Sequence, residues 1–440
     1  MSPSEQLVDD PEFPVEDGPD PVLGPSKPRL LGVLGPGLIT GASDDDPSGI
    51  ATYSQAGAQL GFGCLWLMLF SYPLMAATQE ISARIGRTTG RGLAGNMRRH
   101  YPAWVGTSCI LLLLIANVIN LSADLGAMGD VGAAIIGGPR AAYVVAFGTF
   151  CMLMQVLVQY ARYVAILKWL SLVLFAYFGT LLMVRIPWGD VAWGLFVPSF
   201  TANENFVAVT VAILGTTISP YLFFWQSSQE AEDQRERPLR DPLVRAPEQA
   251  PKAFARIRLD TYIGMALSNL VALAIIITAA ATLHASGTTH IDTAQQAAEA
   301  LKPIAGELAF LIFAAGIVGT GLLAVPVLAG SAAYAIGEAL RWPVGLARKP
   351  KEARAFYITL AAATLIGTAI IFLPIDPIRA LYWSAIINGV MAAPIIAMIM
   401  VMASSRRIMG QFTLPFPLKL LGWVSVVVMG FCVIGLFVTI

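Results

Sequence analysis

The sequence predicts an all-helical protein that crosses a membrane about eleven times. Of its 440 residues, 56% are hydrophobic and only 13% are charged, about half the charged fraction of a typical soluble domain. Apolar stretches able to cross a hydrocarbon core of about 30 Å recur from near residue 33 to the C-terminus. Two of these stretches are interrupted by proline and polar residues, a pattern tolerated at membrane depth only where the backbone lines a cavity.

The basic residues orient the predicted spans. The spans lie near residues 33–60, 62–84, 103–125, 141–160, 163–185, 205–230, 257–283, 304–337, 355–374, 378–403 and 418–439. With the N-terminus in the cytoplasm, most Arg and Lys residues fall in inside loops, as the positive-inside rule requires. We therefore expect an integral protein of the plasma membrane, the inner membrane of a bacterium, with its C-terminus outside.

The residues outside the spans exclude several functional classes. Residues 1–30 are acidic and proline-rich, unlike a signal peptide, and are expected to form a disordered cytoplasmic tail. Four scattered cysteines without CxxC spacing, and histidines confined to loops, argue against a disulfide or zinc site. Since no His, paired Cys or Ser/Lys constellation lies within a span, no catalytic residue is assigned and we expect no enzyme. Nothing in the sequence predicts nucleic-acid binding.

The first break reads Asp44-Asp45-Asp46-Pro47-Ser48-Gly49. Proline lacks an N–H and disfavours helix in the residue before it, whereas glycine permits unusual backbone, so two half-helices are expected. Carbonyls that end the first half, from about Ser43, would face the Asp46 carboxylate and form a cation site of oxygen ligands. Successive helical residues are about 100° apart. Asp46 is therefore the expected ligand, with Asp44 and Asp45 supporting it or attracting cations.

The second break, in the sixth span, reads Thr216-Thr217-Ile218-Ser219-Pro220-Tyr221. It places hydroxyls and loose carbonyls beside a proline, and a simple proline kink is the alternative interpretation. Breaks in the first and sixth spans are typical of transporters built from two inverted repeats.

These motifs resemble those of the Nramp family of divalent-metal transporters. Residues 35–37, Gly-Pro-Gly, and 46–52, Asp-Pro-Ser-Gly-Ile-Ala-Thr, are similar to the family's segment leading into Asp-Pro-Gly-Asn. Residues 215–221 match the second motif, which normally ends Met-Pro-His, and Asp124 matches an aspartate on the family's proton route. The resemblance implies a LeuT-type fold, with repeats at about 33–185 and 205–403 and an extra helix at 418–439, in a transporter domain over 31–440.

The resemblance also implies a ligand set and shows where this chain departs from it. Asp46, Ser43 and Thr216 match family ligands, whereas Gly49 replaces an asparagine and Ser219 a methionine. The histidine after the proline is Tyr221, and a glutamate before Asp124 is Asn117. A hydroxyl in place of a thioether removes the preference for transition metals, and a wider site suits hydrated Mg²⁺. The pattern resembles the Nramp-related magnesium transporter branch.

The function implied is uptake of Mg²⁺, with Mn²⁺ also accepted, by alternating access and without proton coupling. The transported cation and the lipid bilayer are the only partners expected, no cofactor is needed, and a monomer suffices. The alternatives are a proton-coupled Mn²⁺/Fe²⁺ symporter, in which Asp124 carries the proton, or an organic-substrate transporter of the same fold. A further alternative is a membrane-bound metal sensor, which binds the ion without transporting it. Such a protein would usually carry a sizeable soluble output domain.

Two further groups of residues are functional candidates. Asn388 could approach the ion in an occluded state, or be an ordinary polar packing residue. Glu80 and Arg84 at the end of the second span, together with Glu230 at the end of the sixth, fit an inner-gate salt-bridge network or solvated helix ends.

Overall fold

A computed structural model describes residues 36–158, 166, 175–200, 204–236, 240–289, 291, 302–372 and 377–439. These residues form helices and contain no strand. The first half comprises α2 (Pro36–Asp44), α3 (Pro47–Leu60), η1 (Gly61–Cys64), α4 (Leu65–Thr89), α5 (Leu93–His100), α6 (Ala103–Ile136), α7 (Arg140–Leu157), α9 (Phe175–Met183) and α10 (Trp188–Phe196). The second half comprises α11 (Glu204–Thr217), α12 (Pro220–Arg235), η3 (Pro247–Gln249), α13 (Ala250–Ala279), η4 (Ala280–His284), α15 (Lys302–Leu340), α16 (Arg354–Ile370), α17 (Pro377–Ser404), α18 (Arg406–Met409) and α19 (Phe416–Thr439).

The predicted membrane class is confirmed. Within the described ranges, eight helical segments are long and apolar enough to cross a membrane, and α16 is a shorter apolar helix. The expected span near 163–185 is described mainly through α9, and the expected tail at 1–30 lies outside the described residues. The chain is therefore an integral membrane protein.

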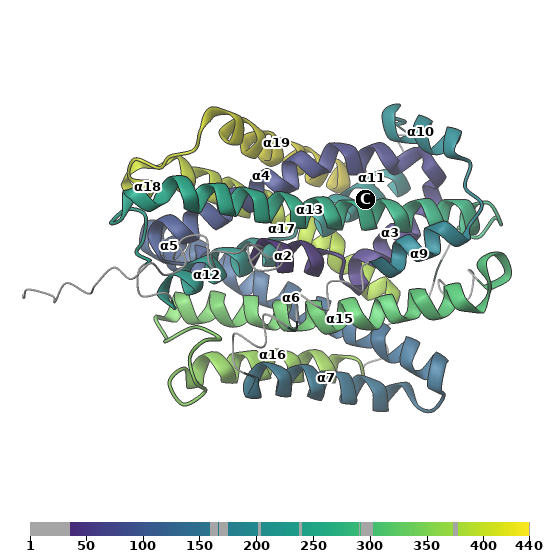
Figure 1. The fold of residues 1–440 in the computed structure, drawn as a ribbon, viewed down its shortest axis with the longest axis horizontal. Helices are drawn as coiled ribbons and strands as arrows, with labels where there is room; N and C mark the ends of the chain where they lie inside the picture. Colours follow the sequence, from purple (N-terminus) through teal and green to yellow (C-terminus); the bar gives the residue numbers. More distant parts are fainter. Residues whose placement is uncertain are drawn as a thin grey trace, which may run out of the picture.

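The two broken helices form the centre of the bundle. In Figure 1, α2, α3 and α12 lie between α13 on one side and α15 on the other, while α7, α16 and α19 lie at the edges. Every residue of α2 is buried, as are residues 47–58 of α3. By contrast, α19 exposes Phe431, Phe437 and Val438 by 70% or more, as expected of a helix that faces lipid.

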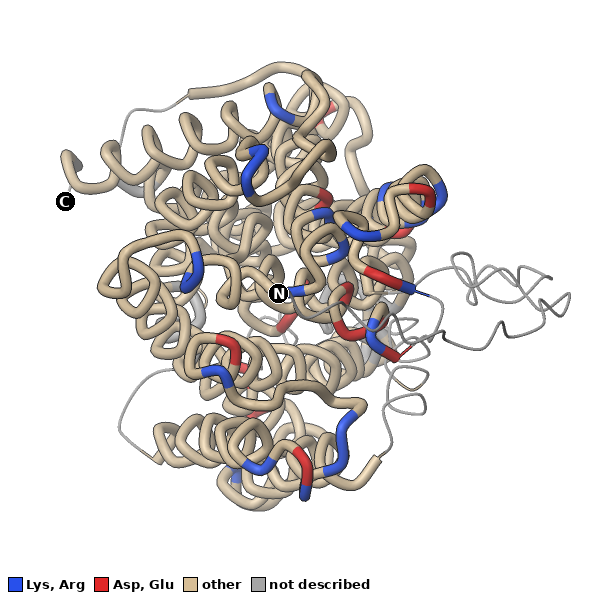
Figure 2. The backbone as a smooth tube through the Cα atoms, turned by 90° about the vertical axis from the view of Figure 1, so that its left-hand side faces the viewer, with Lys and Arg blue, Asp and Glu red and all other residues tan. Residues whose placement is uncertain are grey.

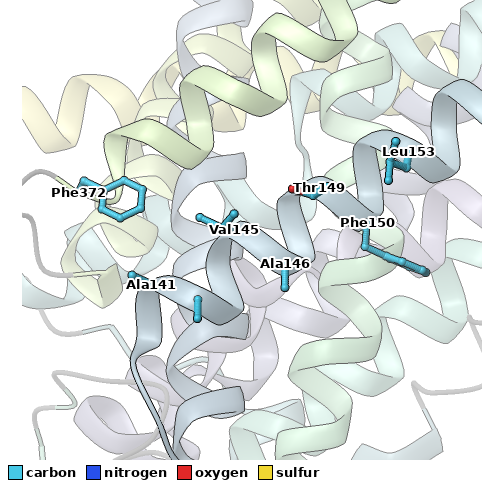
Figure 3. A pocket seen from close by; sticks show the side chains of 8 residues that line it. Ala141, Val145, Ala146, Thr149, Phe150, Leu153 and Phe372 are labelled. Carbon is cyan, nitrogen blue, oxygen red and sulfur yellow. The ribbon is translucent and has the colours of Figure 1, made fainter.

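The outer surface also carries an apolar groove beside α7. Figure 3 shows its lining, which includes Val145, Phe150 and Leu153 of α7 and Phe372 after α16. The groove offers almost no polar group to an ion, so it is better suited to lipid chains than to cargo.

The bundle has one strongly basic end. Arg91, Arg98 and Arg99 lie on or just before α5, and Arg406 and Arg407 lie on α18 at the same end. Figure 2 views the molecule from this side and shows the Lys and Arg segments there. We call it the basic end; α10 and η1 lie at the opposite end (Figure 1).

Helix α2 is held tightly against α13. A Cβ atom on Gly41 would lie 2.2 Å from the backbone of Gly264, so only glycine permits this approach. The carboxylate of Asp260 on α13 accepts the N–H groups of Gly37 at 2.8 Å and Leu38 at 3.0 Å. Asp260 thus satisfies free amides at the start of α2, a capping role normally filled by a neighbour in sequence.

Candidate functional site

The two predicted breaks are present and face each other across the centre of the bundle. Helix α2 ends at Asp44 and α3 begins at Pro47, while α11 ends at Thr217 and α12 begins at Pro220. Each proline occupies the first position of its helix, where its missing N–H has no partner to lose. A hydrogen bond of 2.8 Å from the Tyr221 hydroxyl to the Ser43 carbonyl joins the two breaks.

The Asp46 carboxylate is buried and receives hydrogen bonds on both oxygens. Its Oδ1 accepts the hydroxyl of Ser48 and the N–H of Gly49, both at 2.7 Å. Its Oδ2 accepts the amide Nδ2 of Asn120 on α6 at 2.8 Å and lies 3.4 Å from the Tyr221 hydroxyl. The Asn120 amide oxygen in turn accepts the hydroxyl of Ser384 on α17. Three helices besides α3 thus position this carboxylate, which is 1% exposed.

The second break satisfies its own carbonyl groups. The Ser219 hydroxyl donates to the carbonyls of Thr216 at 2.7 Å and Gly215 at 2.9 Å. In this conformation the Ser219 side chain therefore points back along α11. The Thr216 carbonyl and the Ser43 carbonyl, both expected ligands, each already accept a protein hydroxyl. A cation would have to displace these hydroxyls or bind through water.

Gly49, at the start of α3, lies close to Thr216 of the second break. A Cβ atom there would lie 3.1 Å from the Asp44 carbonyl oxygen, 3.3 Å from the Thr216 hydroxyl and 3.4 Å from the Tyr53 ring. In this conformation, neighbouring side chains take up the space that a larger ligand at position 49 would need. The absence of a side chain brings Thr216 close to the start of α3.

The neighbouring aspartates are directed elsewhere. Asp44 accepts the hydroxyl of Ser268 on α13 at 2.7 Å, on the side of α2 that packs against that helix. Neither oxygen of Asp45, which is fully buried, accepts a hydrogen bond from the described residues. Among the three aspartates, Asp46 alone accepts a side-chain hydrogen bond from α6 in the described residues, and its role as the ligand stays a prediction.

Two other candidates lie on helices around the breaks. Asp124 on α6 accepts the Ser48 N–H at 3.2 Å through Oδ1, and no described donor reaches its Oδ2. It therefore caps α3 from another helix and keeps one carboxylate oxygen free. Asn388 on α17 is 2% exposed, and its amide oxygen has no hydrogen-bond partner among the described residues.

The expected inner-gate residues form separate ion pairs. Arg84 binds Glu80, four residues earlier on α4, at 2.7 Å, and its guanidinium lies 4.3 Å from the centre of the Phe254 ring. Glu230 of α12 pairs with Arg256 of α13. The partner of Glu230 is therefore Arg256, which was not predicted from the sequence. The Glu80–Arg84 pair lies within α4, whereas the Glu230–Arg256 pair joins α12 to α13, so the two pairs are separate.

Hydrogen bonds hold the segments on both sides of the site. Asp260 holds α2 on the side of the basic end. On the other side, Gln55 of α3 binds the Thr289 carbonyl at 3.0 Å and the Ile291 N–H at 3.2 Å. A cavity of about 10 Å³ between α3, α9, α13 and α15, lined in part by Ser54 and Tyr177, holds at most about one water. Within the described residues, Asp46 is shielded from solvent, since its exposure is 1%.

Sequence reasoning missed the residues that approach the breaks from other helices. Asn120, Ser384, Ser268 and Asp260 are all polar residues inside apolar spans, and this is the one signal that could have identified them. Their partners are 74 to 264 residues away in sequence.

The donor atoms at the breaks are of the kind that hard cations prefer. In the described part of the chain, no group of three His, Cys, Asp or Glu side chains is placed to hold a metal ion. The available donors are one carboxylate, backbone carbonyls and hydroxyls, which are the ligands that Mg²⁺, Ca²⁺ and Mn²⁺ prefer.

Comparison with known proteins adds a family and a fold. A family model described as natural resistance-associated macrophage protein-like (Nramp) matches residues 37–439. The structure is similar to that of the Eremococcus coleocola manganese transporter in complex with an aromatic bis-isothiourea compound. The TM-score is 0.74 at 16% identity over 95% of this chain and 89% of that one. A mutant of the same transporter gives 0.72 at 18% identity over 92% and 85%.

A second kind of neighbour is more distant. Mhp1, a nucleobase-cation-symport-1 family transporter in a closed conformation, is similar with a TM-score of 0.53 at 13% identity, over 96% of this chain and 95% of that one. At these identities the likeness establishes the fold. The predicted LeuT-type architecture, with its first and sixth helices broken, is confirmed.

Proposed function

This chain belongs to the Nramp family, and from that premise we propose that it carries Mg²⁺, and also Mn²⁺, into the cytoplasm by alternating access. The observation that carries the proposal is the set of oxygen donors around Asp46 at the meeting point of two broken helices. Position 219, where the family has a thioether, carries a hydroxyl. A site of oxygen donors has no preference for soft transition metals over Mg²⁺.

The proposed ligands are Asp46, the carbonyls of Ser43 and Thr216, and the hydroxyl of Ser219, with Gly49 supplying no side-chain ligand. In this structure Asp46 and the two carbonyls accept protein donors, whereas the Ser219 hydroxyl donates to the Gly215 and Thr216 carbonyls. A partly hydrated Mg²⁺ presents water protons in place of those donors, so it can bind without every ligand reaching the metal. Mg²⁺ usually keeps several waters in protein sites, which agrees with this arrangement.

The hydrogen bonds to Asp46 support transport without protons. After the ion leaves, an ionised carboxylate remains in a low-dielectric environment, where an unpaired charge costs several kcal/mol. Ser48, Gly49 and Asn120 donate to that carboxylate in the structure. We propose that these bonds let the empty carrier return with Asp46 charged. Entry of a divalent ion is favoured by about 4.6 kcal/mol per 100 mV of membrane potential.

The proposed orientation places the basic end in the cytoplasm, because Lys and Arg are retained on that side. The membrane would be the inner membrane of a bacterium, with the C-terminus outside. The pairs Glu80–Arg84 and Glu230–Arg256 would then lie on the inner side of the ion site.

Ion influx into proteoliposomes tests the function. Mg²⁺ and Mn²⁺ uptake would be followed with internal indicators, alongside an internal pH dye, for the native chain and for Asp46→Ala. We expect uptake of both ions, lost in the variant, without acidification. Mn²⁺ uptake with proton entry and no Mg²⁺ uptake would contradict the proposal.

One observation favours a second candidate, a proton-coupled Mn²⁺/Fe²⁺ symporter. Asp124 keeps one buried carboxylate oxygen free and reaches the Asp46 site through the Ser48 amide. The organic-substrate alternative is disfavoured, because the α3 amides that would bind a substrate carboxylate already bond to Asp46 and Asp124.

A further inference from the structure

A second polar feature lies at the basic end, away from the ion site. It is a pocket of about 480 Å³ lined by residues of the α4–α5 turn, α5, the segment before η3, and α18. Six of the lining residues are basic: Arg91, Arg99, His100, Arg245, Arg406 and Arg407. No Asp or Glu is among the residues that line it. We call it the arginine pocket.

The walls of the arginine pocket are fixed by hydrogen bonds. The buried Arg87 side chain binds the Asp241 carbonyl at 2.5 Å and the Gln249 side chain at 2.7 Å. The N–H of Val244 bonds to the carbonyl of Thr88 at 3.3 Å and thereby ties the segment before η3 to the end of α4. The Asn96 amide bonds to Thr89 at 2.9 Å and to the Arg91 carbonyl at 3.0 Å. The pocket is therefore formed before any ligand arrives.

The charges in the pocket lack internal partners. Elsewhere in the described residues, Arg84, Arg140, Arg240 and Arg256 each pair with a carboxylate. None of the five arginines of the pocket forms such a pair within the described chain. His100 binds the Asn96 carbonyl through Nδ1 at 2.9 Å, which leaves Nε2 unused.

The positive-inside rule does not by itself explain why these basic side chains line one pocket. Basic residues anywhere in the loops would satisfy the positive-inside rule, whereas gathering like charges into one concavity is unfavourable unless an anion offsets the repulsion. All five long basic side chains are arginine and none is lysine. The planar guanidinium fork matches phosphate oxygens in pairs, which an ammonium group cannot do.

We propose that the arginine pocket binds the phosphate group of an anionic ligand. The ligand is either the headgroup of an anionic phospholipid or a soluble polyphosphate such as a nucleotide. Because the pocket joins α5 and the end of α4 to α18 and to the segment before α13, its occupant would link elements from both halves of the fold. This site goes beyond the proposed transport function and does not depend on it.

Binding to the full-length protein in nanodiscs tests the proposal at fixed ionic strength. One arm uses phosphatidylcholine discs titrated with ATP or pyrophosphate, and the other replaces part of the lipid with phosphatidylglycerol. Calorimetry measures ATP or pyrophosphate binding, and the thermal unfolding midpoint measures the lipid effect. Binding of ATP or pyrophosphate in the phosphatidylcholine discs identifies a soluble ligand. A higher unfolding midpoint with phosphatidylglycerol, without binding of the soluble anions, identifies a lipid.

The variant Arg406→Gln/Arg407→Gln should weaken the affinity for the soluble anion by about tenfold or more, or abolish the phosphatidylglycerol stabilisation, since it removes two guanidinium groups that would bond to charged phosphate oxygens. The control Arg348→Gln/Lys351→Gln removes the same charge from the same end outside the pocket and should stay within about twofold. Arg99→Gln, which alters α5 instead, should repeat the first result. Equal weakening by the control, or no response to either class of anion, would overturn the proposal.

Discussion

Both breaks have a proline at the first position of the second helix, but their polar groups form hydrogen bonds with different kinds of partner. At the α2–α3 break, Asp46 accepts hydrogen bonds from its own helix and from Asn120 of α6. At the α11–α12 break, the Ser219 hydroxyl returns to carbonyls three and four residues earlier. The first break therefore holds a charge that depends on tertiary contacts, and the second holds neutral donors that satisfy themselves locally.

This difference assigns unequal tasks to the two halves of the fold. Under the proposed function, the carboxylate would supply most of the attraction for a divalent cation, because charge–charge attraction in a low-dielectric site exceeds that of neutral dipoles. The second break would add neutral donors, and its Tyr221 bonds to the Ser43 carbonyl. Changes at the first break should therefore affect transport more strongly than changes at the second.

The largest effect is expected for Asp46→Ala. Loss of the carboxylate should lower Mg²⁺ and Mn²⁺ uptake by about 100-fold or more, because one buried charged ligand contributes several kcal/mol. Asp44→Asn is the matched control, since Asp44 bonds to Ser268 rather than to Asn120. Proteoliposome influx measures both. Equal losses in the two variants would remove the distinction between the aspartates.

The next effect tests how the empty carrier is stabilised. Asn120→Ala removes one hydrogen bond to the Asp46 carboxylate and should slow net influx by about tenfold. Exchange of Mn²⁺ across membranes loaded on both sides needs only the ion-bound carrier, so it should be nearly unchanged.

The control for Asn120→Ala lies on the same helix. Asn117 bonds to the Leu328 carbonyl instead of the carboxylate, and Asn117→Ala should not separate the two rates. If net influx and exchange fall together in Asn120→Ala, the residue has a structural role only.

A smaller effect is expected when Ser219 of the second break is exchanged, alone or together with Gly49 of the first. Ser219→Met combined with Gly49→Asn restores the ligand types of the wider family and should shift selectivity severalfold toward Mn²⁺ over Mg²⁺. Because a Cβ at position 49 would lie 3.3 Å from the Thr216 hydroxyl, Ser219→Met alone serves as the variant without crowding. Competition between the two ions for uptake gives the ratio, and an unchanged ratio in both variants would refute the argument from ligand softness.

The smallest effect concerns closure at the basic end. Asp260→Asn weakens the cap on α2, which is worth about 1 kcal/mol and about a fivefold change in the population of the open state. In a background without the native cysteines, Thr40→Cys should react faster with a thiol reagent applied from the basic end. Ser268→Ala is the control, because Ser268 bonds to Asp44 and leaves the cap intact. Unaltered reactivity in Asp260→Asn would mean that glycine packing alone keeps α2 in place.

The sequence by itself determined the membrane class and the positions of both breaks, and it predicts Asp46 as the ligand. Pro73, Pro326 and Pro394 lie inside helices, so proline alone does not mark a break; at positions 47 and 220 it stands beside polar residues and favours the start of a helix. Apolar length alone locates the spans. Only the tertiary structure decided what meets at the breaks. Asn120, Asp260 and Ser268 lie inside apolar helices whose sequence does not say which face turns inward, because membrane-spanning segments lack the polar and apolar faces that orient a helix in water. Their partners were fixed by the packing of helices far apart in the chain.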